Sequence, residues 1–232
     1  MGFDYLYNKS WKDLSREERY FCIDLFLQLK MNGTESQFIN WLINYCNLLL
    51  AEEFNGKDYE IGIEVCYYRD LIFHYELPSA GRFDNKKLIK GFLKRTFDFC
   101  IFLPKDIIII EAKAAKGMTS KQMKEFTIDK EAIKVCHKGL NLPQVNVHMI
   151  ALVSQQYVSR PGFRRGEANV KMNFNEIITW DQIQECGCNY QMPIKLSTVY
   201  GETHDFPKRT KSLDERIIKE LRLIKDLSSQ ND

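Results

Sequence analysis

Four consecutive isoleucines, residues 107–110, run directly into a Glu-Ala-Lys triplet at 111–113. A run this apolar is typical of a strand that is buried on both faces of a sheet, because a strand with one wet face alternates with polar residues. The preceding segment, 96–103, is rich in β-branched and aromatic residues, and a Pro-Lys-Asp turn separates the two. The sequence therefore predicts an antiparallel hairpin at the centre of a sheet, with opposite charges at its end.

Apolar periodicity elsewhere predicts helices and further strands around this hairpin. The predicted helices are 15–30, 34–49 and 119–139, and the predicted further strands are 59–68, 145–153 and 176–180. The strand at 145–153 follows a helix, so a crossover connection would place it parallel to the isoleucine strand. The predicted class is α/β: a mixed central sheet, with a meander and a parallel crossover strand, flanked by helices.

The remaining segments give weaker signals. Residues 70–82 contain Pro78 and Gly81 and predict a loop with a short strand, while 85–94 predicts a short amphipathic helix. A charged amphipathic helix is expected at 212–227. Because repeats and low-complexity linkers are absent from the sequence, we expect one domain over 1–232. Its parts would be a helical lead-in at 1–55, a core at about 34–185 and a C-terminal extension at 186–232.

Composition limits the partners and the compartment. The 232 residues are 44% apolar with a formal net charge of +2, so any nucleic-acid contact would come from a local basic surface. No apolar run approaches the roughly 18 residues of a membrane span, and no membrane partner is expected. The seven cysteines lie mostly in apolar segments, which favours reduced thiols and a cytoplasmic protein. Cys186 and Cys188 form a lone C-x-C, too few ligands for a structural zinc site.

The hairpin register brings charged side chains together. A turn of two or four residues places position 98 opposite position 111, so Asp98 and Glu111 become cross-strand neighbours with Cβ atoms about 5 Å apart. Lys113 lies two residues beyond Glu111 and shares its face. Two carboxylates at this distance repel each other and destabilise a bare sheet. A divalent cation between them turns this repulsion into a net attraction. The pattern therefore predicts a site for Mg²⁺, which takes carboxylate oxygens at about 2.0–2.1 Å.

Asp98, a hairpin, and Glu111-Ala112-Lys113 at the end of an apolar strand together resemble the PD-(D/E)xK nuclease superfamily, also called restriction-endonuclease-like. The core of that family runs helix, three-strand meander, crossover helix, strand, and 34–153 follows this order. Phe97 stands where the family name puts proline. The resemblance implies that Asp98, Glu111 and the backbone carbonyl of Ala112 bind Mg²⁺, with Mn²⁺ able to substitute, and that Lys113 helps to activate water.

The resemblance also suggests supporting residues on two helices. Many members carry a glutamate on the first core helix, and Glu35 is the best match here, as a tentative metal ligand, while Glu52 and Glu53 near the end of that helix match less well. Many carry a glutamine and an aromatic residue four positions later on the helix after the lysine, which Gln122 and Phe126 match. Gln122 would support Lys113 or contact the nucleic-acid backbone. His148 lies in an apolar strand and is expected to be a hydrogen-bonded core histidine.

Two basic segments are candidates for gripping phosphates, which supply most non-specific affinity for nucleic acid. They contribute Lys86, Lys87, Lys90 and Arg95 before the Asp98 strand, and Arg160, Arg164 and Arg165 in a later loop. We therefore expect a Mg²⁺-dependent endonuclease acting on DNA, of restriction, defence or repair type, with RNA left open as a substrate. The alternative is an inactive nucleic-acid-binding or adaptor module on the same fold. By analogy with relatives, a homodimer is a further candidate assembly.

Overall fold

The protein is described by a computed structural model at residues 18–74, 95–113, 120–159 and 174–192, all within one compact unit. Its centre is a five-stranded sheet in the order β1-β2-β3-β4-β5. The strands are β1 (Glu60–Val65), β2 (Phe97–Phe102), β3 (Asp106–Ala112), β4 (Asn146–Val153) and β5 (Glu176–Thr179). The first three pair antiparallel, whereas β4 and β5 run parallel to β3. The prediction of an α/β domain with a mixed sheet is confirmed.

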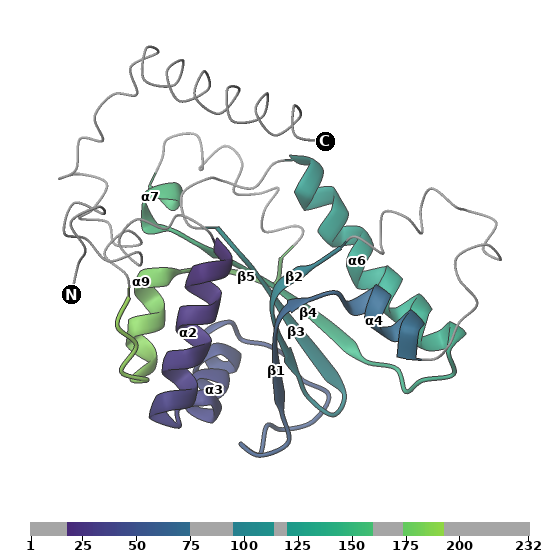
Figure 1. Ribbon diagram of the computed structural model, residues 1–232, viewed down its shortest axis with the longest axis horizontal. Helices are drawn as coiled ribbons and strands as arrows, with labels where there is room; N and C mark the ends of the chain where they lie inside the picture. The colour runs from purple at the N-terminus through teal and green to yellow at the C-terminus, as the bar shows by residue number, and fades with distance from the viewer. Residues whose placement is uncertain (1–17, 75–94, 114–119, 160–173, 193–232) are drawn as a thin grey trace, which may run out of the picture. The chain divides into compact units, whose positions relative to one another are not determined.

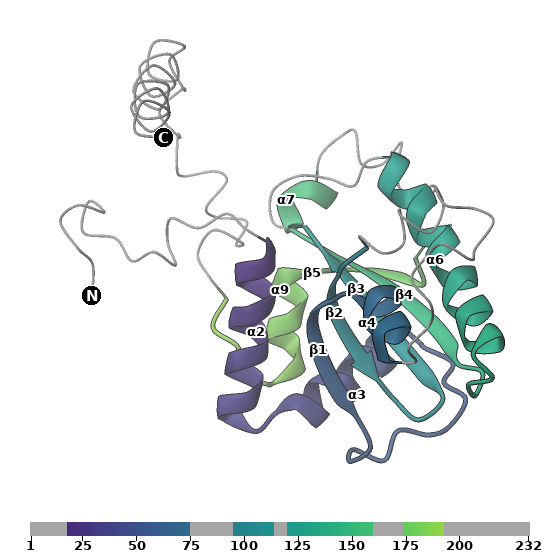
Figure 2. The ribbon, with the colours of Figure 1, turned by 45° about the vertical axis from the view of Figure 1, so that its right-hand side comes forward.

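Helices cover both faces of the sheet (Figures 1 and 2). One face carries α2 (Glu18–Asn32), α3 (Glu35–Tyr45) and α9 (Trp180–Ile183), followed by the 3₁₀ helix η3 (Gln184–Cys186). The other face carries α4 (Tyr67–His74) and α6 (Ser120–Gly139). The short helix α7 (Gln155–Val158) follows β4. The sheet is thus the middle of three layers, which explains why its central strands are apolar on both sides.

β3 shows this double burial directly. Every residue of β3 is buried, and its side chains alternate between two cores. Ile108 and Ile110 pack with the α2 and α3 side chains, while Ile107 and Ile109 pack with α4 and α6. The four isoleucines therefore fill both cores at once, as the alternation of a strand requires.

The hairpin register agrees with the prediction. Cα partners run from Phe102 opposite Ile107 to Phe99 opposite Ile110. The turn is closed by a hydrogen bond of 2.9 Å from the Leu103 amide to the Asp106 carbonyl. After the long helix α6, β4 returns parallel to β3 and pairs along its whole length, as expected for a crossover unit.

The segment after β1 differs from its prediction. The strand ends at Val65, and α4 begins at Tyr67, inside the range expected to be extended and before the expected loop. Tyr67 and Tyr68 are buried against the α6 face of the sheet, and Leu71 packs there too, a spacing that suits a helix. Tertiary packing therefore decides this element. The helices predicted at 85–94 and 212–227, and the basic loop at 160–166, lie outside the described residues.

The Sγ atoms of Cys186 and Cys188 are paired with each other in the structure. Cys22, Cys46, Cys66, Cys100 and Cys136 are free thiols. In the described part of the chain, no helix is long and apolar enough to cross a membrane.

Candidate functional site

Asp98 and Glu111 meet where β2 and β3 separate. The backbone pairing of these strands ends at Phe99 opposite Ile110, and continuing the register by one residue sets Asp98 beside Glu111. Beyond that point the Asp98 side chain takes over the role of the missing backbone partner. Its Oδ2 accepts a hydrogen bond of 2.9 Å from the Ala112 amide. The carboxylate is therefore fixed between the two strand ends.

Lys113 completes the group. Its Nζ donates to Glu111 Oε1 at 2.8 Å and to the Ala112 carbonyl at 2.8 Å. The same Nζ lies 4.0 Å from Asp98 Oδ2. One cationic atom is thus surrounded by two carboxylates and one backbone carbonyl. The structure brings together the four neighbouring positions on which the prediction depended.

The group is largely removed from solvent. Side-chain exposure is 16% for Asp98, 8% for Glu111 and 12% for Lys113. Burial raises the pKa of the Glu111 carboxyl to about 7, and the Asp98 carboxylate adds to the rise, while Lys113 and then Arg95 lower it. A protein places two acids in such a setting at a structural cost, and perturbed acids of this kind cluster at functional sites.

The backbone of Lys113 is held from two sides. Its amide donates to the Leu152 carbonyl of β4 at 2.7 Å. Its carbonyl accepts a hydrogen bond of 3.3 Å from Trp180 Nε1. Trp180 is fully buried at the start of α9 and touches the Phe21 ring edge-on. Sequence reasoning missed this tryptophan, although its position just after a strand that ends at the same sheet edge is a usable signal.

The donor set fits a hard divalent cation. The three candidate ligand atoms are all oxygens: Asp98 Oδ2, Glu111 Oε1 and the Ala112 carbonyl oxygen. They already surround the positively charged Nζ of Lys113. Mg²⁺ prefers oxygen ligands and keeps several waters, so one or two carboxylates suffice. Within the described ranges, no group of three or more His, Cys, Asp or Glu residues has a metal-holding geometry. The fit therefore depends on a carbonyl and waters as well as on the two acids.

Glu35 lies away from this group. Glu35 is the first residue of α3 and is 8% exposed. Its Oε1 atom forms an ion pair with Lys30 Nζ at 2.7 Å. Burial acts most strongly on the Glu35 pKa and raises it, but hydrogen bonds from Lys30 and the backbone bring the net pKa below its usual value. The hydrogen bond to Glu35 is the main cause that raises the pKa of Lys30, and the charge of nearby Tyr59 adds to the rise. Tyr59 precedes Glu60, which pairs with Phe102 at the end of β2 remote from Asp98.

The other end of α2 borders the site instead. Burial raises the pKa of the Cys22 thiol well above its usual value, and the charges of Asp98, Glu111 and Glu64 add to the rise. The helix glutamate expected near the metal is therefore not brought there. The reason is geometric: α2 runs along the sheet, and α3 begins only where α2 has reached the far end.

The remaining predicted residues are distributed as follows. Gln122 lies in the first turn of α6, and only its backbone is described. Phe126, four residues later, is completely buried and packs on Phe174 with ring centroids 5.2 Å apart. The following predicted phosphate contacts lie outside the described residues: Lys86, Lys87, Lys90, Arg160, Arg164 and Arg165.

Arg95 is engaged inside the protein. Its Nη2 and Nε donate to Asp129 Oδ2 at 2.6 and 3.0 Å, and its Nη1 reaches Glu125 Oε2 at 3.4 Å. The guanidinium carbon lies 4.6 Å from the centroid of the Phe126 ring. Tyr68 donates to the other Asp129 oxygen at 2.9 Å. This arrangement gives Arg95 a role in attaching α6 to the sheet, and its expected contact with phosphate stays a prediction.

Glu64 is a neighbour that sequence reasoning missed. β1 pairs with β2 through Ile63 opposite Phe99 and Val65 opposite Phe97, so Glu64 lies beside Asp98. Its φ of 53° is unusual for a residue with a long side chain. Its Oε2 pairs with Arg19 Nε at 3.1 Å. The alternation of 59–65 in the sequence contains the needed signal, because it fixes which strand position faces Asp98 once the strands are aligned.

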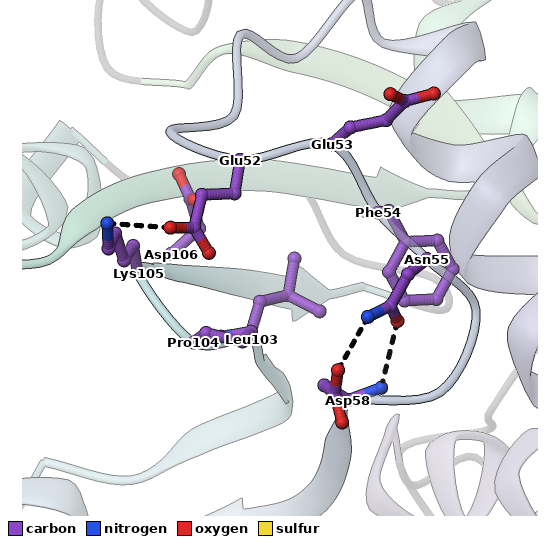
Figure 3. A pocket seen from close by; sticks show the side chains of 9 residues that line it. All are labelled: Glu52, Glu53, Phe54, Asn55, Asp58, Leu103, Pro104, Lys105 and Asp106. Carbon is purple, nitrogen blue, oxygen red and sulfur yellow. Dashed lines mark hydrogen bonds and ion pairs between the residues drawn. The ribbon is translucent and has the colours of Figure 1, made fainter.

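A small pocket lies at the opposite end of the sheet (Figure 3). It is formed by the loop after α3 and by the β2–β3 turn, and Lys105 pairs there with Glu52 at 2.6 Å. Asp106 lies beneath it and accepts a hydrogen bond of 2.8 Å from His148, which confirms the predicted hydrogen-bonded core histidine. Asp106 and Glu111 occupy opposite ends of β3, so this pocket is distinct from the carboxylate group.

The chain matches no known protein-family model, no curated protein and no solved structure. Any proposal for this site therefore depends on the chain's own residues and their geometry.

Proposed function

We propose that the protein is a Mg²⁺-dependent endonuclease that hydrolyses DNA phosphodiester bonds, on a restriction-endonuclease-like core. One observation carries the proposal: Asp98, Glu111, the Ala112 carbonyl and Lys113 converge within hydrogen-bonding reach at the end of β2 and β3. The order of elements supports it: α3, the antiparallel strands β1, β2 and β3, the crossover helix α6 and the parallel strand β4 occur in this order, with α4 as an additional helix between β1 and β2.

Each residue has a role in this proposal. Asp98, Glu111 and the Ala112 carbonyl would hold Mg²⁺, with Mn²⁺ able to take its place. The chemistry that such an ion supplies is activation of water and stabilisation of charge on a phosphate. The Lys113 ammonium would stabilise negative charge on the attacked phosphate and orient the attacking water. Arg95 and Trp180 would act indirectly, by holding α6 and the end of β3 in place.

A plasmid-cleavage assay tests the proposal. Purified protein is expected to nick or cut supercoiled DNA with Mg²⁺ or Mn²⁺, and to lose this activity in EDTA or after Lys113→Ala. Lys105→Ala is the matched control, since Lys105 also pairs with a glutamate but lies at the far end of β3 and should leave cleavage unchanged. Equal cleavage in EDTA, or by the Lys113→Ala protein, would discard the mechanism.

The second candidate is a nucleic-acid-binding or adaptor module with vestigial acids. One observation favours it: among the residues that the structure describes, no group of three or more His, Cys, Asp or Glu side chains has a metal-holding geometry. This module would bind DNA in a salt-dependent way without cleaving it. It would also show no rise in unfolding temperature with millimolar Mg²⁺ or Mn²⁺, because a ligand stabilises only a native state that binds it.

A further inference from the structure

The Lys113 ammonium already occupies the centre of the oxygen site. It lies 2.8 Å from Glu111 Oε1, 2.8 Å from the Ala112 carbonyl oxygen and 4.0 Å from Asp98 Oδ2. These are the three oxygens assigned above to Mg²⁺. A divalent ion at about 2.0–2.1 Å from the same atoms would occupy the space of the ammonium, and the two cations would repel each other. The site therefore has room for one cation at a time.

We propose that Lys113 is the resident cation of the ion-free site and that a divalent ion binds by displacing its ammonium group from Glu111 and Ala112. This inference rests on the proposed function, since it assumes that the site takes a divalent ion. It adds an order of events: binding of the ion releases Lys113 from the carboxylate, and only then is the ammonium available to a phosphate. The ion-free enzyme is held inactive by its own lysine.

The surroundings allow the side chain to move alone. The Lys113 amide and carbonyl are fixed by Leu152 and Trp180, so the strand end keeps its position when the ammonium leaves. A lysine side chain has a flexible four-carbon stem, which lets the charge move without a backbone change. Glu111 and Asp98 are only 8% and 16% exposed, so a cation between them offsets the cost of burying two carboxylates. Exchange of one cation for another retains this offset.

Metal affinity measured without substrate tests the proposal. Isothermal titration with Mn²⁺ is expected to show about tenfold or tighter binding by Lys113→Met than by the wild-type protein, because the competing charge is gone. Lys105→Met is the matched control, which should bind Mn²⁺ with wild-type affinity. Glu111→Gln should bind weakly or not at all. Unchanged or weaker affinity in Lys113→Met, while the wild-type protein binds Mn²⁺, overturns displacement but leaves the metal site intact.

The two proposals fail in different ways. If neither the wild-type protein nor Lys113→Met binds Mn²⁺, the metal site itself is refuted, and with it the displacement. If Lys113→Met does not fold, a measurement on the wild-type protein tests the displacement instead. That measurement is an NMR spectrum of lysine side chains labelled with ¹⁵N, in which ammonium groups held by hydrogen bonds exchange slowly enough to be seen.

The Lys113 ammonium signal, assigned by its absence from Lys113→Arg, is expected in the ion-free protein. Saturating Mg²⁺ should shift it strongly or broaden it beyond detection, since the group leaves its partners. A signal that persists unchanged at saturating Mg²⁺ would show that the ammonium stays in place and would refute the displacement.

Discussion

Replacing Arg95 with methionine leaves the buried Asp129 carboxylate without its positively charged partner. Asp129 has a side-chain exposure of 1% and receives two hydrogen bonds from Arg95, which is itself 19% exposed. Breaking a buried ion pair from one side costs about 3–5 kcal/mol, because the remaining carboxylate has lost its counter-charge. In a chain of this size each kcal/mol is worth about 2–4 °C, so we expect the unfolding temperature of Arg95→Met to fall by about 6–20 °C.

The loss of stability in Arg95→Met should depend on pH, because the substitution changes the pKa of Asp129. Burial raises the pKa of Asp129, while Arg95 and then Tyr68 oppose the rise. Without Arg95 the pKa rises further, so the folded variant binds more protons than its unfolded chain between the unfolded and folded pKa values. Stability of the variant then falls as pH rises through that window and recovers as pH falls. The loss relative to wild type should therefore be larger at about pH 8 than near pH 5.

Urea unfolding of a double-mutant cycle measures the pair directly. Asp129→Asn added to Arg95→Met should restore at least about 1 kcal/mol, because the uncompensated charge is removed. Single effects that add within about 0.5 kcal/mol, or a loss that does not change with pH, would refute the view that Arg95 serves chiefly to neutralise Asp129.

Three further outcomes are expected. Asp106→Ala should lower the free energy of unfolding by about 3 kcal/mol in chemical denaturation, because the buried carboxylate accepts hydrogen bonds from three donors. Lys105→Ala should leave the unfolding temperature unchanged in calorimetry, since Lys105 and its partner Glu52 are both more than half exposed. Gly187→Ala should destabilise by about 1 kcal/mol in the same denaturation assay, because Gly187 has a φ of +70° and the added Cβ would lie 2.9 Å from Gln37.

The hairpin could be predicted because two simple rules act together. A strand alternates with period two, and a turn of even length aligns Phe99 with Ile110 and hence Asp98 with Glu111. The long helix after Lys113 was equally accessible, because Ser120 begins it and Gly139 ends it, as the sequence indicates. Local signals and tertiary packing agree at these places.

At α4 the local sequence signals and the tertiary packing disagree. The sequence through Tyr67 and Tyr68 continues an extended pattern, yet both residues belong to a helix. Tyr68 donates to Asp129 on α6 and Tyr67 contacts His137 on the same helix. Those partners are more than 60 residues away, so no local window contains the reason for the change. The Arg95–Asp129 pair was missed for the same reason, although a lone acid at an inward position of α6 is a signal of a buried partner.

The candidate site shows the same contrast within a few ångströms. Asp98 and Glu111 lie on adjacent strands joined by a short turn, so their proximity follows from counting residues. A residue on a preceding helix reaches the site only if the correct end of that helix faces the open strand ends, and residue counting does not decide this. α2 brings Cys22 toward the acids, while Glu35 begins the next helix beside Lys30. Counting residues thus predicts the proximity of two acids on adjacent strands more securely than the position of an acid on a preceding helix.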